Sequence, residues 1–243
     1  NDEVEATVHD SKYFTEKQFS EHLENCPVNE TSFLHFNVRS MNANFDRLSL
    51  FLDTFQDKYP IIGITETWFS SHPTAMYDLP RYQLITNDRQ SRSGGGVAMY
   101  IPISFECHTK TELYIMNDSL ESLFVEIIIP GEKNLLVGVV YRPPNGDVNE
   151  FIEELSNTLS SPLSRNKKII IMGDFNINLL SYDHDNSVNN FVDTLSTFSL
   201  IPLINKPTRV ADNSQTLIDN IFTNLHPIPT AGIIVADISD HFP

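Results

Sequence analysis

Several features are scarce in this sequence of 243 residues. Its two cysteines, Cys26 and Cys107, are too few for a disulfide-stabilised scaffold and fit a reducing compartment, nuclear or cytoplasmic. No apolar run approaches the roughly 18 residues of a membrane span, because the longest, Leu123–Pro130, is interrupted by Glu126. The polar, acidic stretch after Asn1 has no signal-peptide character. We therefore expect an intracellular chain with no membrane partner.

Basic residues are also scarce. The chain has 16 Lys and Arg against 32 Asp and Glu, a net charge of −16, and this excess of negative charge taken alone argues against binding to DNA phosphates. The charge is uneven, because residues 1–30 hold eight acidic groups against Lys12 and Lys17. We interpret residues 1–30 as an acidic leader, partly helical or disordered, that lies outside the main core. Its amphipathic stretch, Thr15–Leu23, is the candidate helix.

The remaining composition is that of a folded domain. Apolar residues make up 40% of the chain and aromatic residues 10%, which argues against intrinsic disorder. No internal repeat or long low-complexity linker interrupts residues 31–243, so we expect one domain there.

Strand-like and helix-like segments alternate from Phe33 onward. The predicted strands are Phe33–Val38, Ile61–Thr65, Tyr82–Thr86, Gly96–Ile101, Leu120–Ile129, Asn134–Tyr141, Lys168–Gly173 and Ile233–Ala236. The predicted helices are Asn44–Phe55, Asp147–Leu159 and Asn186–Phe198. Two strands follow one another across the Pro-Gly turn at 130–131, so they must pair antiparallel. This strand-rich pattern predicts an α/β fold of packed mixed sheets with helices outside.

Polar residues stand at or just after the ends of several predicted strands, where rigid scaffolds commonly hold ligands. They are Asn37, Glu66, Tyr141, Asp174 with Asn176, and Asp240 with His241. Carboxylates and amides in such positions supply oxygen ligands for Mg²⁺, and a histidine supplies a donor for phosphate. Asp219 stands between apolar neighbours, so we expect it to point inward or to have a partner.

Each of these residues alone has a structural interpretation as well. Glu66 fits a solvated loop acid, Asn37 a turn cap, and Asp219 a structural ion pair. The glycines at 94–96 lack the helix start and the Lys or Ser/Thr of a phosphate loop, so they predict a tight bend. His35 and the other scattered histidines show no ligand spacing, which argues against zinc.

The ordered set is far more specific than any member of it. It resembles the exonuclease-endonuclease-phosphatase superfamily, and within it most closely the endonuclease domains of non-LTR retrotransposons. The resemblance covers residues 33–243. It is carried by Phe36-Asn37-Val38-Arg39-Ser40, Ile64-Thr65-Glu66-Thr67-Trp68, Gly94-Gly95-Gly96-Val97-Ala98, Tyr141-Arg142-Pro143-Pro144, Gly173-Asp174-Phe175-Asn176, Ile218-Asp219-Asn220-Ile221 and Ser239-Asp240-His241. It implies a four-layered α/β sandwich, in which two packed mixed β-sheets are flanked by helices.

The resemblance also implies roles in hydrolysis of a phosphodiester bond. Glu66 would bind Mg²⁺, for which Mn²⁺ could substitute, and Asn37 and Asp240 would complete or hydrogen-bond the metal shell. Asp174 would take the proton of the attacking water, and Asn176 would hold the water or a phosphate oxygen. The set is completed by His241, which would donate to the phosphate, by Asp219, which would orient that imidazole, and by Tyr141, whose hydroxyl would face the phosphate.

The implied activity is nicking of target DNA to prime a linked reverse transcriptase encoded downstream, and we expect the isolated domain to be a monomer. Two alternatives stay open. The same core could act on RNA, a phosphoinositide or a nucleotide, or the domain could be a catalytically inactive binding module.

The distribution of basic residues weakens the argument from net charge. Six of them fall beside the motif loops and are the candidate DNA contacts: Arg39, Arg89, Arg92, Arg142, Lys206 and Arg209. We expect weak, salt-sensitive DNA binding along one rim of the site.

Overall fold

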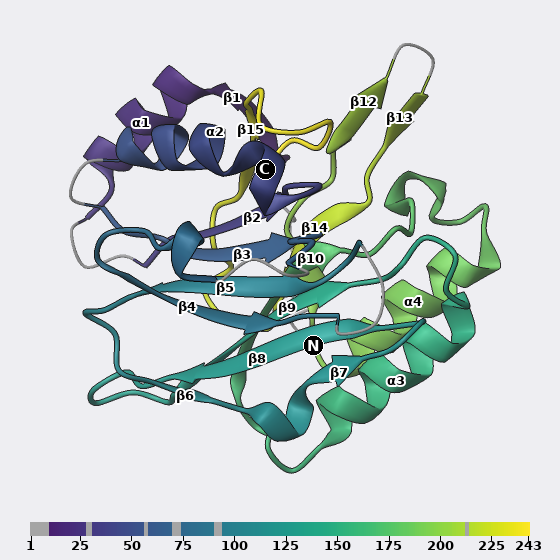
Figure 1. Ribbon diagram of the computed structural model, residues 1–243. Helices are drawn as coiled ribbons and strands as arrows, with labels where there is room; N and C mark the ends of the chain where they lie inside the picture. Colours follow the sequence, from purple (N-terminus) through teal and green to yellow (C-terminus); the bar gives the residue numbers. More distant parts are fainter. Residues whose placement is uncertain (1–9, 28–30, 56–57, 70–73, 90–93, 212–213) are drawn as a thin grey trace.

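The computed structural model describes residues 10–27, 31–55, 58–69, 74–89, 94–211 and 214–243 (Figure 1). Two mixed sheets lie face to face. One sheet has four strands in the order β2-β3-β5-β4, namely β2 Phe33–Asn37, β3 Ile61–Thr65, β5 Val97–Pro102 and β4 Tyr82–Asn87. The other has seven strands in the order β11-β14-β10-β9-β8-β6, with β7 also on β8. They are β6 Cys107–Thr109, β7 Ile115–Met116, β8 Glu121–Ile127, β9 Leu135–Tyr141, β10 Lys168–Asp174, β11 Ile201–Pro202 and β14 Asp219–Thr223.

Helices cover the two outer faces and complete a four-layered sandwich (Figure 1). Helices α1 (Glu16–Asn25) and α2 (Met41–Asp53) lie on the four-stranded sheet, and α3 (Val148–Ser160) and α4 (Asn186–Thr197) lie on the seven-stranded sheet. The expected fold class, a sandwich of two mixed sheets between helices, is confirmed.

Two small strand pairs and three short 3₁₀ helices complete the architecture. Strand β1 (Lys12–Thr15) pairs parallel with β15 (Gly232–Val235). Strands β12 (Arg209–Ala211) and β13 (Ser214–Thr216) form an antiparallel ribbon that stands away from both sheets (Figure 1). The 3₁₀ helices are Thr74–Tyr77, Thr111–Leu113 and Leu179–Ser181. None of the helices in the described ranges is both long and apolar enough to cross a membrane.

Strands β8 and β9 explain why the central sequence reads as continuous apolar runs. Along β9, Val137 and Val139 face the core between the sheets, whereas Leu136 and Val140 face the core under α3 and α4. Both faces are therefore buried, so there is no alternation with polar residues. The two strands pair antiparallel from Glu121 opposite Tyr141 onward, as the short turn between them requires.

The helix starts follow local side-chain chemistry. Helix α3 begins after Asp147, whose carboxylate accepts hydrogen bonds from the backbone N–H groups of Asn149 and Glu150. Helix α2 begins at Met41, three residues before the predicted start, because the Ser40 hydroxyl accepts from Ala43 N and caps it.

The interpretation of residues 1–30 as a leader outside the core is wrong for residues 10–27. Thr15 and Gln18 form a capping box that starts α1. Leu23 of this helix is only 6% exposed and belongs to the core that α2 shares with the four-stranded sheet, and Phe19 packs against the same core. Residues 1–9 and 28–30 lie outside the described residues.

Leu23→Ala tests whether this segment contributes to the stability of the domain. We expect it to lower the free energy of unfolding by about 2–5 kcal/mol, because it removes a buried side chain and leaves a cavity. Leu50→Ala on α2 is the matched control, since Leu50 is 71% exposed. Urea unfolding followed by circular dichroism measures both. Equal stabilities of the two variants would show that residues 10–27 are not integral to the core.

Candidate active site

The polar strand ends meet at one edge of the sandwich. Asn37 ends β2, and Glu66 directly follows the neighbouring parallel strand β3. In the other sheet, Asp174 ends β10 opposite Tyr141 on parallel β9 and opposite Asp219 on antiparallel β14. Because β14 runs the other way, its first residue lies beside the last residue of β10. The topology therefore brings carboxylates of both sheets to a single site.

The Asn37 side chain links the two sheets. Its Nδ2 atom donates to Glu66 Oε1 at 2.8 Å and to Asp174 Oδ2 at 2.7 Å. Its Oδ1 atom accepts from the Arg39 backbone N–H at 3.1 Å. Because one amide group donates hydrogen bonds to both carboxylates, Glu66 and Asp174 are held next to each other with fixed orientations.

The turn after β10 fixes Asp174 and Asn176. The Asn176 backbone N–H donates to Asp174 Oδ1 at 2.9 Å, and its side-chain Nδ2 donates to Arg142 O at 2.8 Å. Asn176 has φ 47°, a left-handed conformation that asparagine tolerates. Gly173 must be glycine, because a Cβ there would lie 1.8 Å from Val140 O on β9.

Asp219 and His241 form a buried pair. His241 Nδ1 lies 2.9 Å from Asp219 Oδ2, and the Thr208 hydroxyl donates to the same oxygen at 2.8 Å. The loop that carries His241 is held by Ser239, whose hydroxyl donates to Asn37 O at 2.6 Å and accepts from His241 N at 3.1 Å. The imidazole is thereby oriented by a carboxylate.

Electrostatics at this site are dominated by burial and by neighbouring carboxylates. Burial, and then the charge of Asp219, raise the pKa of Asp174. Burial alone would lower the pKa of His241, but its hydrogen bond to Asp219 and the surrounding carboxylates outweigh burial and raise it. Burial, and then the charges of Glu66 and Asp174, raise the pKa of Tyr141, so its hydroxyl keeps its proton.

The donor set fits a hard divalent cation. Asp174, Asp219 and His241 each offer a ligand atom, and these atoms lie within 4.8 Å of one another. Glu66 adds a fourth group beside Asp174 through the shared Asn37 amide. A cation offsets the mutual repulsion of the buried carboxylates, and oxygen ligands of this kind suit Mg²⁺ or Mn²⁺.

Asp240, the third predicted metal ligand, has both carboxylate oxygens in ion pairs. Oδ1 accepts from Arg39 at 2.9 Å and Oδ2 accepts from Arg209 at 2.7 Å. Partial burial would raise the pKa of Asp240, but the hydrogen bond to Arg39, the nearby His241 and the contact with Arg209 outweigh burial and lower it. Its role in metal binding stays a prediction.

Three residues of the site had no assigned role in the sequence analysis. Trp68 Nε1 donates to Glu66 Oε2 at 3.2 Å, and the indole is 40% exposed beside the site. Thr208 and His35 both face Asp219. The period of two along β2 could have found His35, since it shares a face with Asn37. Nothing local marks Thr208, which stands outside any predicted strand.

The predicted DNA contacts separate into three groups. The prediction that Arg142 lies on an exposed DNA-binding rim is wrong, because this residue is only 5% exposed. Its guanidinium donates to the carbonyls of Phe175, Gly146 and Asn176 at 2.7–2.9 Å. Arg89 is largely buried and ion-paired with Glu121. Arg39 and Arg209 are exposed and pair with Asp240, whereas Lys206 is half-buried and pairs with Asp10 at 2.9 Å. Arg92 lies outside the described residues.

A model of the endonuclease/exonuclease/phosphatase family matches residues 34–241, and the chain belongs to this family. A search of curated proteins found no match.

Solved structures show the same fold. The endonuclease domain of TRAS1, a telomere-specific non-LTR retrotransposon, has a TM-score of 0.68 and 16% identity, over 88% of this chain and 95% of that one. The AP endonuclease LMAP from Leishmania major has a TM-score of 0.69 and 12% identity, over 97% and 95% of the two chains. The 3′ phosphatase NExo from Neisseria, bound to a product DNA hairpin, has a TM-score of 0.62 and 13% identity, over 88% and 97%.

Arg142→Gln tests the structural role of the buried arginine. We expect it to lower the free energy of unfolding by about 2 kcal/mol or more, because it leaves several buried carbonyls without donors. Arg39→Gln removes an exposed ion pair instead, and its effect should stay within about 1 kcal/mol. Chemical unfolding of both variants measures the difference. Similar stability losses would contradict the assignment of Arg142 to the interior framework.

Proposed function

We propose that this domain is a divalent-metal-dependent DNA endonuclease that nicks target DNA for a non-LTR retrotransposon. The observation that carries the proposal is the convergence of Asn37, Glu66, Asp174 and the Asp219–His241 pair at one sheet edge. Family membership supports phosphodiester hydrolysis, and the fold shared with the TRAS1 domain supports the retrotransposon context. The nick would expose a 3′-hydroxyl for a linked reverse transcriptase, and the domain would act as a monomer.

The chain's own residues divide the hydrolysis between them. Asp174, held by Asn37 and Asn176, orients the attacking water and accepts its proton. His241, kept protonated by Asp219, donates to the phosphate as negative charge develops. Tyr141, which keeps its phenolic proton, offers a further donor.

A bound Mg²⁺ or Mn²⁺ would supply positive charge next to the reacting phosphate and its leaving oxygen. Glu66 would hold it, with Asn37 and Asp240 as the proposed supporting ligands. Asp174 and the protonated His241, although close to one another and to Asp219, would serve proton transfer rather than metal binding. Both Glu66 oxygens already accept hydrogen bonds, from Asn37 and from Trp68, so the carboxylate is oriented before the metal binds.

Nicking of supercoiled plasmid in Mg²⁺ tests the assignment. We expect wild-type protein to nick, EDTA to stop it, and Asp174→Asn or His241→Ala to reduce the rate at least a hundredfold, because each removes a proton-transfer or charge-stabilising group. Asp193→Asn, an exposed change of the same charge on α4, should nick like wild type.

Equal nicking by all variants would show a contaminating nuclease and refute the assignment. Parallel assays with RNA, a phosphoinositide and a nucleotide compare the alternative substrates. If one of these compounds is hydrolysed faster than DNA, it becomes the assigned substrate in place of DNA. If calorimetry detects no Mg²⁺ binding, the result favours an inactive binding module.

Arg39→Gln tests the proposed phosphate-binding rim. Arg39 is exposed next to the site, so the variant should bind DNA more weakly, and the slope of log affinity against log salt should fall by about 1. Lys133→Gln removes the same charge at the opposite end of β9 and should change neither quantity. Fluorescence anisotropy across a salt series measures both. An unchanged slope in Arg39→Gln would place the DNA elsewhere.

A further inference from the structure

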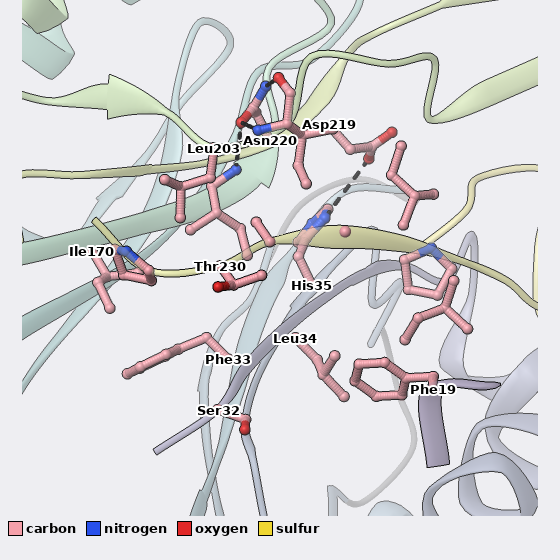
Figure 2. Close-up of a pocket in the computed structure, with 18 of the residues that line it drawn as sticks. Phe19, Ser32, Phe33, Leu34, His35, Ile170, Leu203, Asp219, Asn220 and Thr230 are labelled. Carbon is pink, nitrogen blue, oxygen red and sulfur yellow. Dashed lines mark hydrogen bonds and ion pairs between the residues drawn. The ribbon is translucent and has the colours of Figure 1, made fainter. Parts of the chain in front are cut away.

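His35 is a buried histidine that takes no part in the hydrolysis described above. It stands two residues before Asn37 on β2, and its side chain points to the same side of the sheet. Figure 2 shows its ring directed from β2 toward the Asp219 carboxylate at the start of β14. It therefore faces Asp219 Oδ1, whereas His241 Nδ1 is hydrogen-bonded to the other oxygen, Oδ2.

The surroundings of His35 select one tautomer. Nε2 lies 3.1 Å from the Thr65 hydroxyl, and Nδ1 lies 3.8 Å from Asp219 Oδ1. A neutral imidazole has one donor and one acceptor nitrogen, and here each nitrogen faces a different oxygen. A hydrogen on Nε2 would leave the Nδ1 lone pair facing a carboxylate. A hydrogen on Nδ1 faces that carboxylate favourably, and the Thr65 hydroxyl then donates to Nε2.

The Asp219 carboxylate is satisfied on one side only. Oδ2 accepts from both His241 and Thr208, whereas Oδ1 is buried and has no hydrogen-bond partner in the part of the chain that the structure describes. A buried carboxylate oxygen without a donor carries a free-energy cost. The distance of 3.8 Å between His35 Nδ1 and Asp219 Oδ1 is less than about 1 Å longer than a hydrogen-bond distance. A cavity of about 540 Å³ is lined by both side chains, among others (Figure 2).

We propose that His35 is a positioning residue that donates its Nδ1 hydrogen to Asp219 Oδ1 and thereby fixes the orientation of His241. With donors on both oxygens, the plane of the Asp219 carboxylate cannot rotate, and the His241 ring that depends on it is aimed at one point. The effect on catalysis rests on the proposed function, whereas the hydrogen-bond chain from Thr65 to His241 does not.

Two substitutions of His35 separate a positioning role from a packing role. His35→Asn keeps an amide N–H near the place of Nδ1, facing Asp219. His35→Gln keeps a polar group near the place of Nε2, facing Thr65, and gives up the donor to Asp219. We expect His35→Gln to lower the kcat of nicking by about tenfold or more with KM unchanged, and His35→Asn to recover most of that loss. His184→Gln, an exposed histidine, should match wild type.

A spectroscopic readout tests the hydrogen-bond chain without any substrate. In protein with ¹⁵N-labelled histidine, the Nδ1–H signal of His241 should be sharp and protected from exchange in wild type and in His35→Asn. It should exchange faster in His35→Gln. Thr65→Val removes the hydroxyl that fixes the His35 tautomer, so the His241 Nδ1–H should exchange faster in this variant too. It provides the test if His35→Gln does not fold.

The outcomes separate this proposal from the proposed function. Faster exchange in His35→Gln or Thr65→Val, together with protection in His35→Asn, supports the positioning role even if wild-type protein nicks no DNA. Unchanged exchange in all variants overturns it, even if wild-type nicking is robust. Equal losses of kcat in His35→Asn and His35→Gln, at equal thermal stability, would also overturn it by showing that only the shape of the histidine matters.

Discussion

The site depends on one hydrogen-bonding group, the Asn37 amide, at the seam between two sheets. Packing of apolar side chains brings the sheets together but does not set their register to the accuracy that chemistry needs. The two N–H bonds of Asn37 reach Glu66 of one sheet and Asp174 of the other, and this adds directional contacts across the seam. A shift of either sheet would cost a buried charge-assisted hydrogen bond, so the relative position of the two carboxylates is tied to the stability of the fold.

The same seam concentrates like charges where water is scarce. Asp174 and Asp219 lie side by side in paired strands, and their repulsion is part of what raises the pKa of Asp174. His241 and a cation are the two natural ways to offset that repulsion. The site is thus preorganised to bind positive charge. An anionic phosphodiester enters it most favourably together with a cation, because the cation offsets the charge of the phosphate as well as that of the carboxylates.

Sequence periodicity predicted the buried strands well, because β3 and β9 are apolar on both faces and end in polar residues. The order of the polar residues then indicated the site. Local signals could not find Thr208, whose role comes from a contact with Asp219 across a loop. They also led to a wrong prediction for Arg142. An arginine is usually exposed, and the backbone carbonyls that bind its guanidinium inside the protein become known only from the structure. The amphipathic stretch Thr15–Leu23 was correctly predicted as helical, but the acidic charge of residues 1–30 led to its placement outside the core, to which Leu23 in fact belongs.

The parallel pairing of β1 with β15 has a consequence for the order of events during synthesis. Lys12 pairs with Gly232 and Thr15 with Val235, so β1 has no partner until residues 232–235 have been synthesised. Such contacts are the slowest to form, since they close the longest loops. The loop bearing His241 follows β15 directly. Glu66 and Asp174 are therefore synthesised long before His241, so a growing chain has these two carboxylates well before it has the imidazole that completes the set.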